Sequence, residues 1–404
     1  MSIPNDPPLF QGLKVIDCAS WIAAPSAATI LGDMGAEVIK VEPTGWGDAY
    51  RIFPRLVNSP KGDSNYSWQL TNHSKKSLSL NLKSEAGQQV LHQLISGADI
   101  FITNLPVRNR QGLSMSYEQV HQSNQQIIYA SLTAMGESGP KRHDDGFDQV
   151  SYWAHTGLLG LMGRPGQPPS RALAGSGDHP SAVALFAAIA CALYKKERTG
   201  QGSLVHTSLL ANGYWAGAIF ATAALAGADF QHFEQNTAWL MEPYRTQDDR
   251  WLAINMMRFE EQQQLFLRLI GLEHLLKQEI FADLVARNKA GSQMHNLVQE
   301  QLAQRTLDEW LQLFEPHQFP ITVLGRSDQL CTDEQAQAVG VVQQPPEGSD
   351  LPHAYVAHPI GMQGQKPVPP SAAPKVGQHT DQVLAELGYS SEQIAQMRED
   401  KVVQ

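Results

Sequence analysis

The feature that most constrains the fold is a repeated alternation of short apolar segments with helix-forming segments in the N-terminal third of the chain. Residues 13–18 predict a strand, residues 25–34 a helix that ends at Gly35, and residues 36–42 a second strand. These lengths suit a right-handed crossover between parallel strands. Further strands are expected at residues 77–82, 98–102 and 127–132, with a helix at 84–96. The alternation predicts an α/β fold built on a large, doubly wound, mostly parallel sheet.

The turn after the first expected strand, residues 19–25, contains no glycine. A dinucleotide-binding turn needs glycines at this place so that its backbone can approach a pyrophosphate. The sequence therefore does not support a nicotinamide or flavin cofactor. Ligands of open parallel sheets bind beyond the carboxyl ends of the strands. The residues expected just past strand ends are Trp21, Lys83, Asn104 and Leu105.

The region after about residue 225 has a different pattern. Residues 244–254 predict a hairpin with its turn at Asp248 and Asp249. Thr306 begins a capping-box pattern, which predicts the start of an amphipathic helix. This combination is typical of a small α+β domain.

The last part of the chain combines an irregular stretch with a final helix. Residues 330–373 are rich in Pro, Gly and Gln, and Ser390 begins a second capping box that predicts a helix over residues 390–397. We therefore expect three parts: a large α/β domain over residues 1–225, a smaller α+β domain over residues 226–328, and a return segment over residues 329–404 whose C-terminal helix packs on the large domain.

The composition excludes several kinds of function. The chain has 404 residues and a net charge of −10, which argues against nucleic acid as the main partner, since phosphate neutralisation needs a basic surface. Cys18, Cys191 and Cys331 lie far apart, which argues against disulfides and a zinc site and favours a reducing, cytoplasmic setting. No signal peptide and no apolar run of about 18 residues is visible, so no membrane partner is expected. The 14 histidines show no helical metal-binding pair, and no metal is expected.

Asp178 is the residue on which a functional interpretation depends. It follows Gly175-Ser176-Gly177 and precedes an apolar segment, residues 181–194, that predicts a buried helix. The local pattern favours a plain helix cap, because aspartate is a preferred capping residue. The same carboxylate is a candidate nucleophile. The glycines are expected to leave room for another molecule, and the helix-end amides and dipole to keep the carboxylate ionised at neutral pH.

Basic side chains near two expected strand ends form a candidate phosphate site on an otherwise acidic chain. A solvated surface is the alternative for each of them. Trp21 has two interpretations as well, since it is either a wall for an adenine ring or a core residue. The basic residues are Lys75, Lys76, Lys83, Arg108 and Arg110.

Five blocks of sequence are distinctive in their order and spacing. They are residues 13–51, which include Gly47, Asp48 and Arg51, and residues 75–83, 98–104, 177–202 and 377–388. Together they resemble the class III CoA-transferases, the CaiB/BaiF family that includes formyl-CoA transferase, carnitine CoA-transferase and α-methylacyl-CoA racemase. The resemblance spans nearly the whole chain and is weakest from about residue 225 to 330. It implies that two subunits interlock as a homodimer.

The resemblance also implies that Asp178 is the catalytic nucleophile. Its carboxylate would attack an acyl-CoA thioester and pass CoA to a second carboxylic acid through mixed-anhydride and aspartyl-CoA intermediates. CoA and acyl-CoA are then substrates, and no tightly bound cofactor is expected. The CoA-contacting positions of the family correspond here to Ile22, Ala23, Lys83, Asn104, Leu105 and Arg110, with Phe147 and Asp148 near the thioester.

Two departures from the family pattern narrow the chemistry. Racemases of the family carry histidine where this chain has Phe147, and a phenyl ring cannot move a proton. Formyl-CoA transferases carry glutamine at the position that Ile22 occupies here. They also have a glycine-rich loop at the place of residues 239–244, which contain no glycine in this chain. Both differences argue against formyl-CoA and oxalate as substrates. Transfer between two molecules is the main hypothesis. Intramolecular transfer on a dicarboxylic acyl-CoA, racemisation, and a CoA-binding scaffold without activity stay open.

Overall fold

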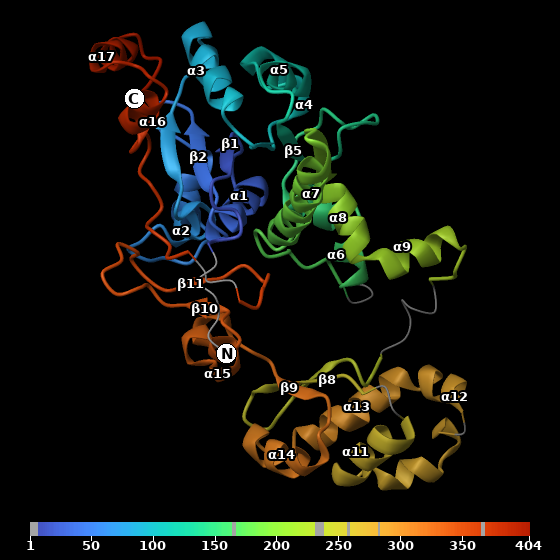
Figure 1. Ribbon diagram of the computed structural model, residues 1–404. Helices are drawn as coiled ribbons and strands as arrows, with labels where there is room; N and C mark the ends of the chain where they lie inside the picture. Colours follow the sequence, from blue (N-terminus) through green and yellow to red (C-terminus); the bar gives the residue numbers. More distant parts are fainter. Residues whose placement is uncertain (1–6, 164–166, 231–237, 257–258, 282, 365–367) are drawn as a thin grey trace. The chain divides into compact units, whose positions relative to one another are not determined.

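A computed structural model of the chain describes residues 7–163, 167–230, 238–256, 259–281, 283–364 and 368–404 (Figure 1). The chain forms two compact units. The first consists of Met1–Gly163, Pro168–Thr222 and Gln335–Gln404, and the second of Arg164–Gln167 and Ala223–Glu334. The first unit is therefore assembled from segments that lie on both sides of the second unit in the sequence.

A six-stranded parallel sheet forms the centre of the first unit. Its strands, in spatial order, are β3 (Lys76–Ser79), β2 (Glu37–Glu42), β1 (Lys14–Asp17), β4 (Ile100–Thr103), β5 (Ile128–Thr133) and β6 (Ser203–Ser208). The strand order reverses between β1 and β4, which leaves a crevice at the carboxyl ends of these two strands. The predicted α/β fold with a doubly wound parallel sheet is confirmed.

Helices cover both faces of this sheet, because successive strand residues point to opposite sides. Val15 belongs to a hydrophobic cluster that includes residues of α1 (Ala23–Asp33) and α7 (Asp178–Thr199). The next residue, Ile16, belongs to the cluster on the other face, together with residues of α3 (Glu85–Ser96). The helices predicted from the first βαβ unit and from the segment after the third strand are confirmed as α1 and α3.

The strand predicted at residues 77–82 is shorter in the structure, where β3 stops before Leu80. Leu80 forms an antiparallel bridge with Val403, and the Asn81 N–H donates a hydrogen bond of 2.8 Å to the Val402 carbonyl. These partners come from more than 300 residues away in the sequence. The local alternation of residues 77–82 therefore could not show where the sheet ends.

Shorter elements complete the first unit. Ser390 caps the last helix through the predicted capping box, which is confirmed. The remaining helices are α2 (Tyr66–Asn72), α4 (Val107–Arg110), α5 (Tyr117–Ser123), α6 (Leu158–Leu161), α8 (Leu209–Ala216), α16 (Thr380–Glu386) and α17 (Ser391–Glu399), with a 3-10 helix at Ala49–Arg55. The return segment adds β10 (Val342–Gln343) and β11 (Tyr355–Val356), which pair antiparallel. Two helices lie at sequence boundaries between the units, α9 (Ala218–Leu225) and α15 (Glu334–Ala338).

The second unit is an antiparallel three-stranded sheet with helices, built around a core of its own. The predicted hairpin is confirmed, and Thr306 forms the predicted capping box with Glu309. Tyr244, Phe266 and Trp310 are among its most deeply buried side chains. Its elements are β7 (Pro243–Arg245), β8 (Trp251–Ile254), β9 (Ile321–Val323), α11 (Gln264–Leu269), α12 (Leu284–Lys289), α13 (Gly291–Leu302) and α14 (Leu307–Phe314).

Candidate active site

Two cavities in the first unit are lined by residues that follow the carboxyl ends of the sheet strands, where α/β sheets bind ligands. The larger measures about 580 Å³ and the smaller about 440 Å³, and both are lined by Ser20 and Leu105. The larger is lined by Cys18, Ala19, Ser20, Val41, Glu42, Pro43, Thr44, Gly47, Asp48, Ala49, Leu80, Asn81, Leu82, Lys83, Leu105, Leu113 and Met115. The smaller is lined by Ser20, Trp21, Ile22, Ala23, Asn104, Leu105, Pro106, Leu132, Thr133, Ala134, Arg142, Asp144, Asp145, Gly146, Phe147, Asp178 and Leu209.

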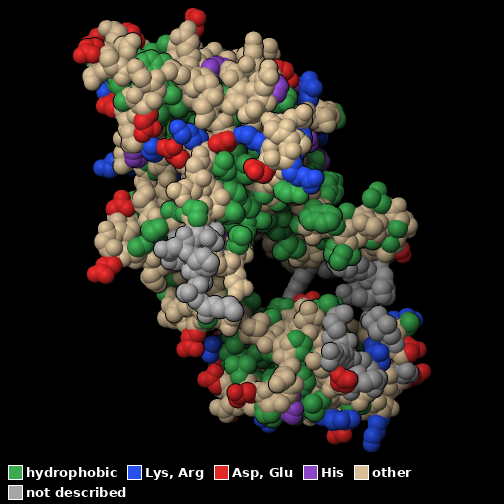
Figure 2. All heavy atoms as spheres, in the orientation of Figure 1, with side chains coloured by type: hydrophobic (Ala, Val, Ile, Leu, Met, Phe, Trp, Pro, Cys, Tyr) green, Lys and Arg blue, Asp and Glu red, His purple; other side chains and the backbone are tan. Residues whose placement is uncertain are grey.

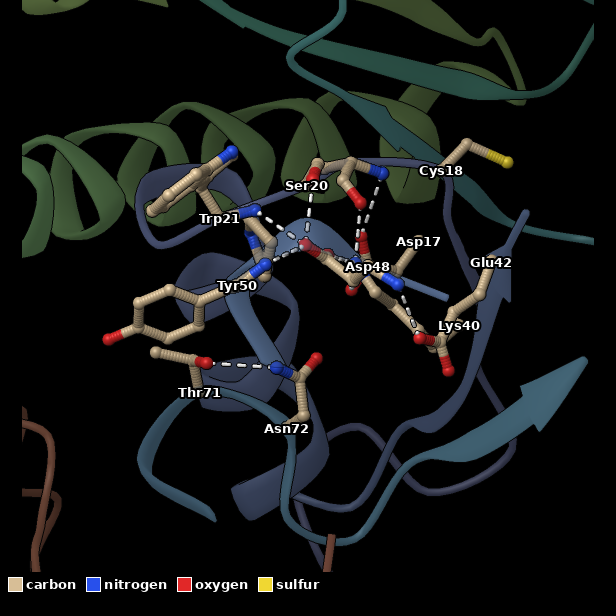
Figure 3. A network of polar contacts seen from close by, with 12 residues as sticks. Asp17, Cys18, Ser20, Trp21, Lys40, Glu42, Asp48, Tyr50, Thr71 and Asn72 are labelled. Atoms are coloured by element: carbon tan, nitrogen blue, oxygen red, sulfur yellow. Dashed lines mark hydrogen bonds and ion pairs between the residues drawn. The ribbon is translucent and has the colours of Figure 1, made fainter. Parts of the chain in front are cut away.

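The glycine-free turn after β1 is held by polar contacts instead of by glycine flexibility. Trp21 adopts a left-handed backbone conformation with φ of 67°, which costs a non-glycine residue roughly 1–2 kcal/mol. The Asp48 carboxylate accepts hydrogen bonds from the Ser20 hydroxyl at 2.7 Å and the Trp21 N–H at 3.2 Å (Figure 3). On the other side, the Asn104 amide accepts from the Ser20 N–H at 2.8 Å and donates to the Ser20 carbonyl at 2.6 Å. Asp48 and Asn104 thus fix the turn that both cavities share.

Asp48 is itself held by a buried network of charges (Figure 3). Its carboxylate lies 2.9 Å from the Lys40 ammonium, which also lies 3.7 Å from Asp17. Lys75 pairs with the same Asp17 at 2.8 Å. Burial opposes ionisation of Asp48, but the Lys40 charge, together with hydrogen bonds from the Tyr50 N–H, Lys40 and Ser20, outweighs burial and lowers the pKa of that carboxyl group. The side chains of this network are at most 1% exposed, so every charge depends on its partner.

The basic side chains of the candidate phosphate site do not form one cluster in this structure, because several of them pair with different carboxylates. Burial lowers the pKa of Lys75 to about 8, and its ammonium is engaged with Asp17. Lys76 pairs with Glu37, and Arg108 pairs with Asp145 at 2.5 Å. The expectation that Lys75 belongs to a phosphate site is therefore wrong.

Arg110 and Lys83 were both expected to contact CoA, and the structure puts them in different surroundings. Arg110 is 4% exposed, lines neither cavity and donates to Glu137 at 3.0 Å and to the Leu105 carbonyl at 2.8 Å. Lys83 is exposed and lines the larger cavity. Of the expected CoA contacts, Lys83 is thus the cation that the structure leaves accessible at a cavity.

Asp178 is the first residue of α7 and lines the smaller cavity. Gly177 occupies the cap position, so the interpretation of Asp178 as the capping residue is wrong. Only 9% of Asp178 is exposed, and no described residue donates a hydrogen bond to its carboxylate. Burial and, next, the charge of Asp148 raise the pKa of Asp178 to about 7. The expectation that the helix end keeps this carboxylate fully ionised at neutral pH is therefore wrong.

Asp148 contacts Gly177, the residue that precedes Asp178. Its carboxylate accepts hydrogen bonds from the Gln149 N–H at 2.7 Å and the Gly177 N–H at 3.2 Å. A Cβ on Gly177 would come within 3.0 Å of the Asp148 Cβ and 2.7 Å of the Tyr152 ring. The space beside Gly177 is thus filled by the protein's own side chains, whereas it was expected to admit another molecule.

Apolar side chains line part of the smaller cavity that Asp178 borders. Trp21 packs edge-to-face on Phe147 with 5.0 Å between the ring centroids, and it also contacts Tyr50 at 5.8 Å. Phe147 is 53% exposed, and Ile22 is buried. No proton-transferring group stands at the position of Phe147.

The structure brings most of the expected site residues together. Ile22, Ala23, Asn104, Leu105, Phe147 and Asp178 line the smaller cavity, Lys83 and Leu105 line the larger one, and Asp148 adjoins Asp178. The sequence interpretation gave no role to Ser20 or Asp48, although Asp48 belongs to the first distinctive block. Their contacts cross between β1, β2 and the loop after β2, and only the strand register reveals them.

No group of three or more His, Cys, Asp or Glu side chains in the described part of the chain could hold a metal ion. None of the helices described is both long enough and apolar enough to cross a membrane.

Comparisons with known proteins identify the family of this chain. Residues 10–380 match the family model for CoA-transferase family III. The chain is 33% identical to (R)-2-hydroxy-4-methylpentanoate CoA-transferase of Clostridioides difficile over 98% of this chain and 99% of that one. It is 29% identical to cinnamoyl-CoA:phenyllactate CoA-transferase of Clostridium sporogenes, with 98% of each chain covered. The solved structure of a CaiB/BaiF family protein from Brucella suis matches with a TM-score of 0.80 at 25% identity, covering 95% of this chain and 100% of that one. The chain therefore belongs to CoA-transferase family III and is an enzyme of that family.

Proposed function

We propose that this enzyme moves CoA from an acyl-CoA to a carboxylic acid, with Asp178 as the covalent nucleophile. The supporting observation is a carboxylate that is 9% exposed, borders a cavity of about 440 Å³ and has no hydrogen-bond donor among the described residues. A purely structural buried carboxylate would be expected to have hydrogen-bond or ion-pair partners. An unpartnered one that borders a cavity is available to react.

The reaction proceeds through two exchanges at the Asp178 carboxyl group. The carboxylate attacks the thioester carbonyl of the donor, the carbon–sulfur bond breaks, and CoA thiolate leaves behind an aspartyl–acyl anhydride. The thiolate then attacks the aspartyl carbonyl, which releases the donor acid and leaves an aspartyl-CoA thioester. The acceptor carboxylate attacks the carbonyl carbon of this thioester, the carbon–sulfur bond breaks, CoA thiolate leaves, and a second anhydride forms. CoA thiolate finally attacks the acyl carbonyl of that anhydride and regenerates Asp178.

The test is to trap these intermediates. The protein is incubated with a panel of acyl-CoA compounds, quenched with hydroxylamine or borohydride, and analysed by peptide mass spectrometry for modification of Asp178. Asp178→Asn should lower turnover by about 10³-fold or more, since an amide cannot form the anhydride. Asp144→Asn is the matched control, because Asp144 is an exposed aspartate that lines the same cavity. Full turnover by Asp178→Asn, with no label on Asp178 in the wild type, would refute the proposal.

The same assay separates the other reactions that the sequence left open. Product formation without an added acceptor would indicate intramolecular transfer. Exchange of the α-hydrogen in heavy water would indicate racemisation. CoA binding without any turnover would indicate a scaffold.

We infer further that the acyl groups carry an apolar side chain. Trp21, Ile22 and Phe147 border the cavity beside Asp178, and burial of an apolar substituent against them is favourable. The relatives from Clostridioides difficile and Clostridium sporogenes are named for 2-hydroxy-4-methylpentanoate, cinnamoyl-CoA and phenyllactate. We expect 2-hydroxy acids with branched or aromatic side chains to be used at least about tenfold more efficiently than succinate or oxalate. Equal kcat/KM values for the two groups would contradict this.

We also propose that the protein works as a homodimer. The sequence of α9, Ala-Ile-Phe-Ala-Thr-Ala-Ala-Leu, is almost wholly apolar, and none of its residues is buried within the chain. Trp215 of α8 and Ile219 of α9 are 80% and 82% exposed. Figure 2 shows hydrophobic side chains gathered around the region where Figure 1 places these helices. An apolar face of this kind is typical of a subunit interface.

Sedimentation of the wild type should give twice the mass of one chain, about 89 kDa from 44.4 kDa per chain. Ile219→Glu should shift the population toward monomer, because it puts a charge into the apolar face. Glu334→Lys is the control variant, because it changes a charge at an exposed residue outside α8 and α9. A monomeric wild type at micromolar concentration would argue against the dimer.

A further inference from the structure

The loop between β2 and the 3-10 helix at Ala49–Arg55 presents an unpaired aromatic side chain. Trp46 is 89% exposed, more than any other tryptophan named among the exposed hydrophobic residues. Among the described residues, its indole has no ring, cation or hydrogen-bond partner. Isolated exposed hydrophobic residues are common on protein surfaces, so exposure alone assigns no role to Trp46.

The backbone on both sides of Trp46 is held in place. The Gly45 N–H donates to the Gln404 side chain at 2.6 Å, and the Asp48 N–H donates to Glu42 at 2.9 Å. Gly47 has φ of 71°, and a Cβ there would come within 2.6 Å of the Glu42 carboxylate, so this position requires glycine. The loop is therefore built to present an exposed indole from a fixed backbone.

The place of this loop suggests what the indole contacts. Pro43, Thr44, Gly47 and Asp48 line the larger cavity, so Trp46 belongs to a loop that borders this cavity. Lys83, an exposed cation, lines the same cavity. A ligand that offers a flat heteroaromatic ring to the loop and phosphate groups to the lysine matches both features.

We propose that Trp46 stacks on the adenine ring of CoA bound in the larger cavity. The inference deepens the proposed function, because it takes CoA to be the ligand of this site. Stacking on an indole carried by a fixed backbone lowers the entropy lost on binding, since the loop need not be ordered by the ligand. It acts on the nucleotide end of CoA, so it should change affinity without any role in the chemistry at Asp178.

The test compares ligands with and without the adenine ring. CoA, adenosine 3′,5′-bisphosphate and 4′-phosphopantetheine are titrated calorimetrically against the wild type, Trp46→Ala and Trp46→Phe. Trp46→Ala should weaken the two adenine-containing ligands by about 5- to 20-fold and leave 4′-phosphopantetheine unchanged. Trp46→Phe should keep most of the affinity. Tyr194→Ala, an exposed aromatic on α7 that lines neither cavity, is the control and should change nothing.

The outcomes separate this inference from the proposed function. If the wild type binds CoA and Trp46→Ala binds it equally well, the stacking role is refuted while CoA transfer stands. Equal weakening of all three ligands would also refute it, because that pattern indicates a general distortion of the site. A change in sedimentation of Trp46→Ala would assign the indole to a subunit contact instead. A wild type that binds none of the three ligands would overturn both proposals.

Discussion

Two neighbouring carboxyl groups, Asp178 and Asp148, should make the activity depend on pH. Asp178 has a pKa raised to about 7 by burial and by Asp148, whose own carboxylate accepts two backbone hydrogen bonds. In the proposed mechanism the ionised form of Asp178 is the nucleophile, so activity should fall as the pH drops below about 7 and the carboxylate is protonated. Asp148 is the part of this arrangement that can be altered without changing Asp178 itself.

Asp148→Asn removes the neighbouring charge and keeps an oxygen that can accept a backbone hydrogen bond. The acid limb of kcat/KM should lie near pH 7 in the wild type and move to lower pH by about half a unit to one unit in the variant. The measurement is the pH profile of kcat/KM between pH 5 and 9. An unchanged acid limb would mean that burial alone sets the pKa of Asp178.

The ionised Asp178 carboxylate should also lower the free energy of unfolding of the protein. A carboxyl group with a raised pKa binds its proton more tightly in the folded state, so its contribution to stability falls as the pH rises from about 4 through about 7. The shift sets an upper limit of about 4 kcal/mol on this cost at pH 8. Asp178→Asn should therefore raise the free energy of unfolding at pH 8, with a gain that shrinks toward pH 4. Urea denaturation at the two pH values measures it, and a variant less stable than the wild type at pH 8 would contradict the expectation.

At the scale of elements, the turn after β1 depends on charges buried beneath it. Asp48 holds the left-handed Trp21 backbone, and Lys40 holds Asp48. Lys40 and Asp48 differ from surface pairs because neither has water as an alternative partner. Loss of Lys40 leaves the buried Asp48 charge without its cation, and loss of Asp48 leaves Lys40 with only the more distant Asp17. Loss of both leaves Asp17 paired with Lys75.

Asp48→Asn alone should destabilise the protein by about 3–5 kcal/mol, because Lys40 loses its nearest carboxylate. Lys40→Met combined with Asp48→Asn should be clearly less destabilised than the sum of the two single variants. Urea denaturation of all four proteins completes the cycle. Asp381→Asn breaks the exposed pair with Arg398 and should cost less than about 1 kcal/mol. Strict additivity of the buried pair would show that the network is not coupled.

The sequence predicted elements better than it predicted contacts. Alternating strands and helices, the hairpin near Asp248 and both capping boxes follow from local spacing, which is a property of neighbouring residues. The pKa of Lys75 depends instead on groups such as Asp17, which lies 58 residues away in the sequence. The pKa of Asp178 depends in the same way on Asp148, which lies 30 residues away. No local pattern reports whether a side chain is buried or which charge faces it, so Lys75 was assigned to a phosphate site and Asp178 was expected to be fully ionised.

For the molecule as a whole, the important feature is that the last part of the chain packs into the first unit. The Arg51 guanidinium and the Trp68 indole N–H both donate to the Pro374 carbonyl, at 3.0 and 3.1 Å. Val402 and Val403 are buried in the hydrophobic cluster that contains the face of the sheet covered by α3. These contacts join residues more than 300 positions apart.

Replacing Val402 and Val403 together by alanine should lower the free energy of unfolding of the first unit by about 2–5 kcal/mol. The second unit has its own core and should keep its unfolding transition. Hydrogen exchange followed by mass spectrometry measures the two units separately. Val339→Ala, at a valine that is 62% exposed, should change neither unit measurably. Equal loss of protection in both units would contradict the independence of their cores.

The split of the first unit across the sequence has a consequence for synthesis on the ribosome. The sheet strands β1 to β6 emerge before the second unit, but the residues that cap β3 and hold the Trp46 loop emerge after it. During translation, the end of β3 lacks its C-terminal partners until more than 100 further residues have been made. The second unit, which is continuous apart from one short segment, can fold in that interval. A product arrested before residue 335 would therefore contain every residue of both cavities and still lack the contacts that the last residues make with Leu80 and with the Trp46 loop.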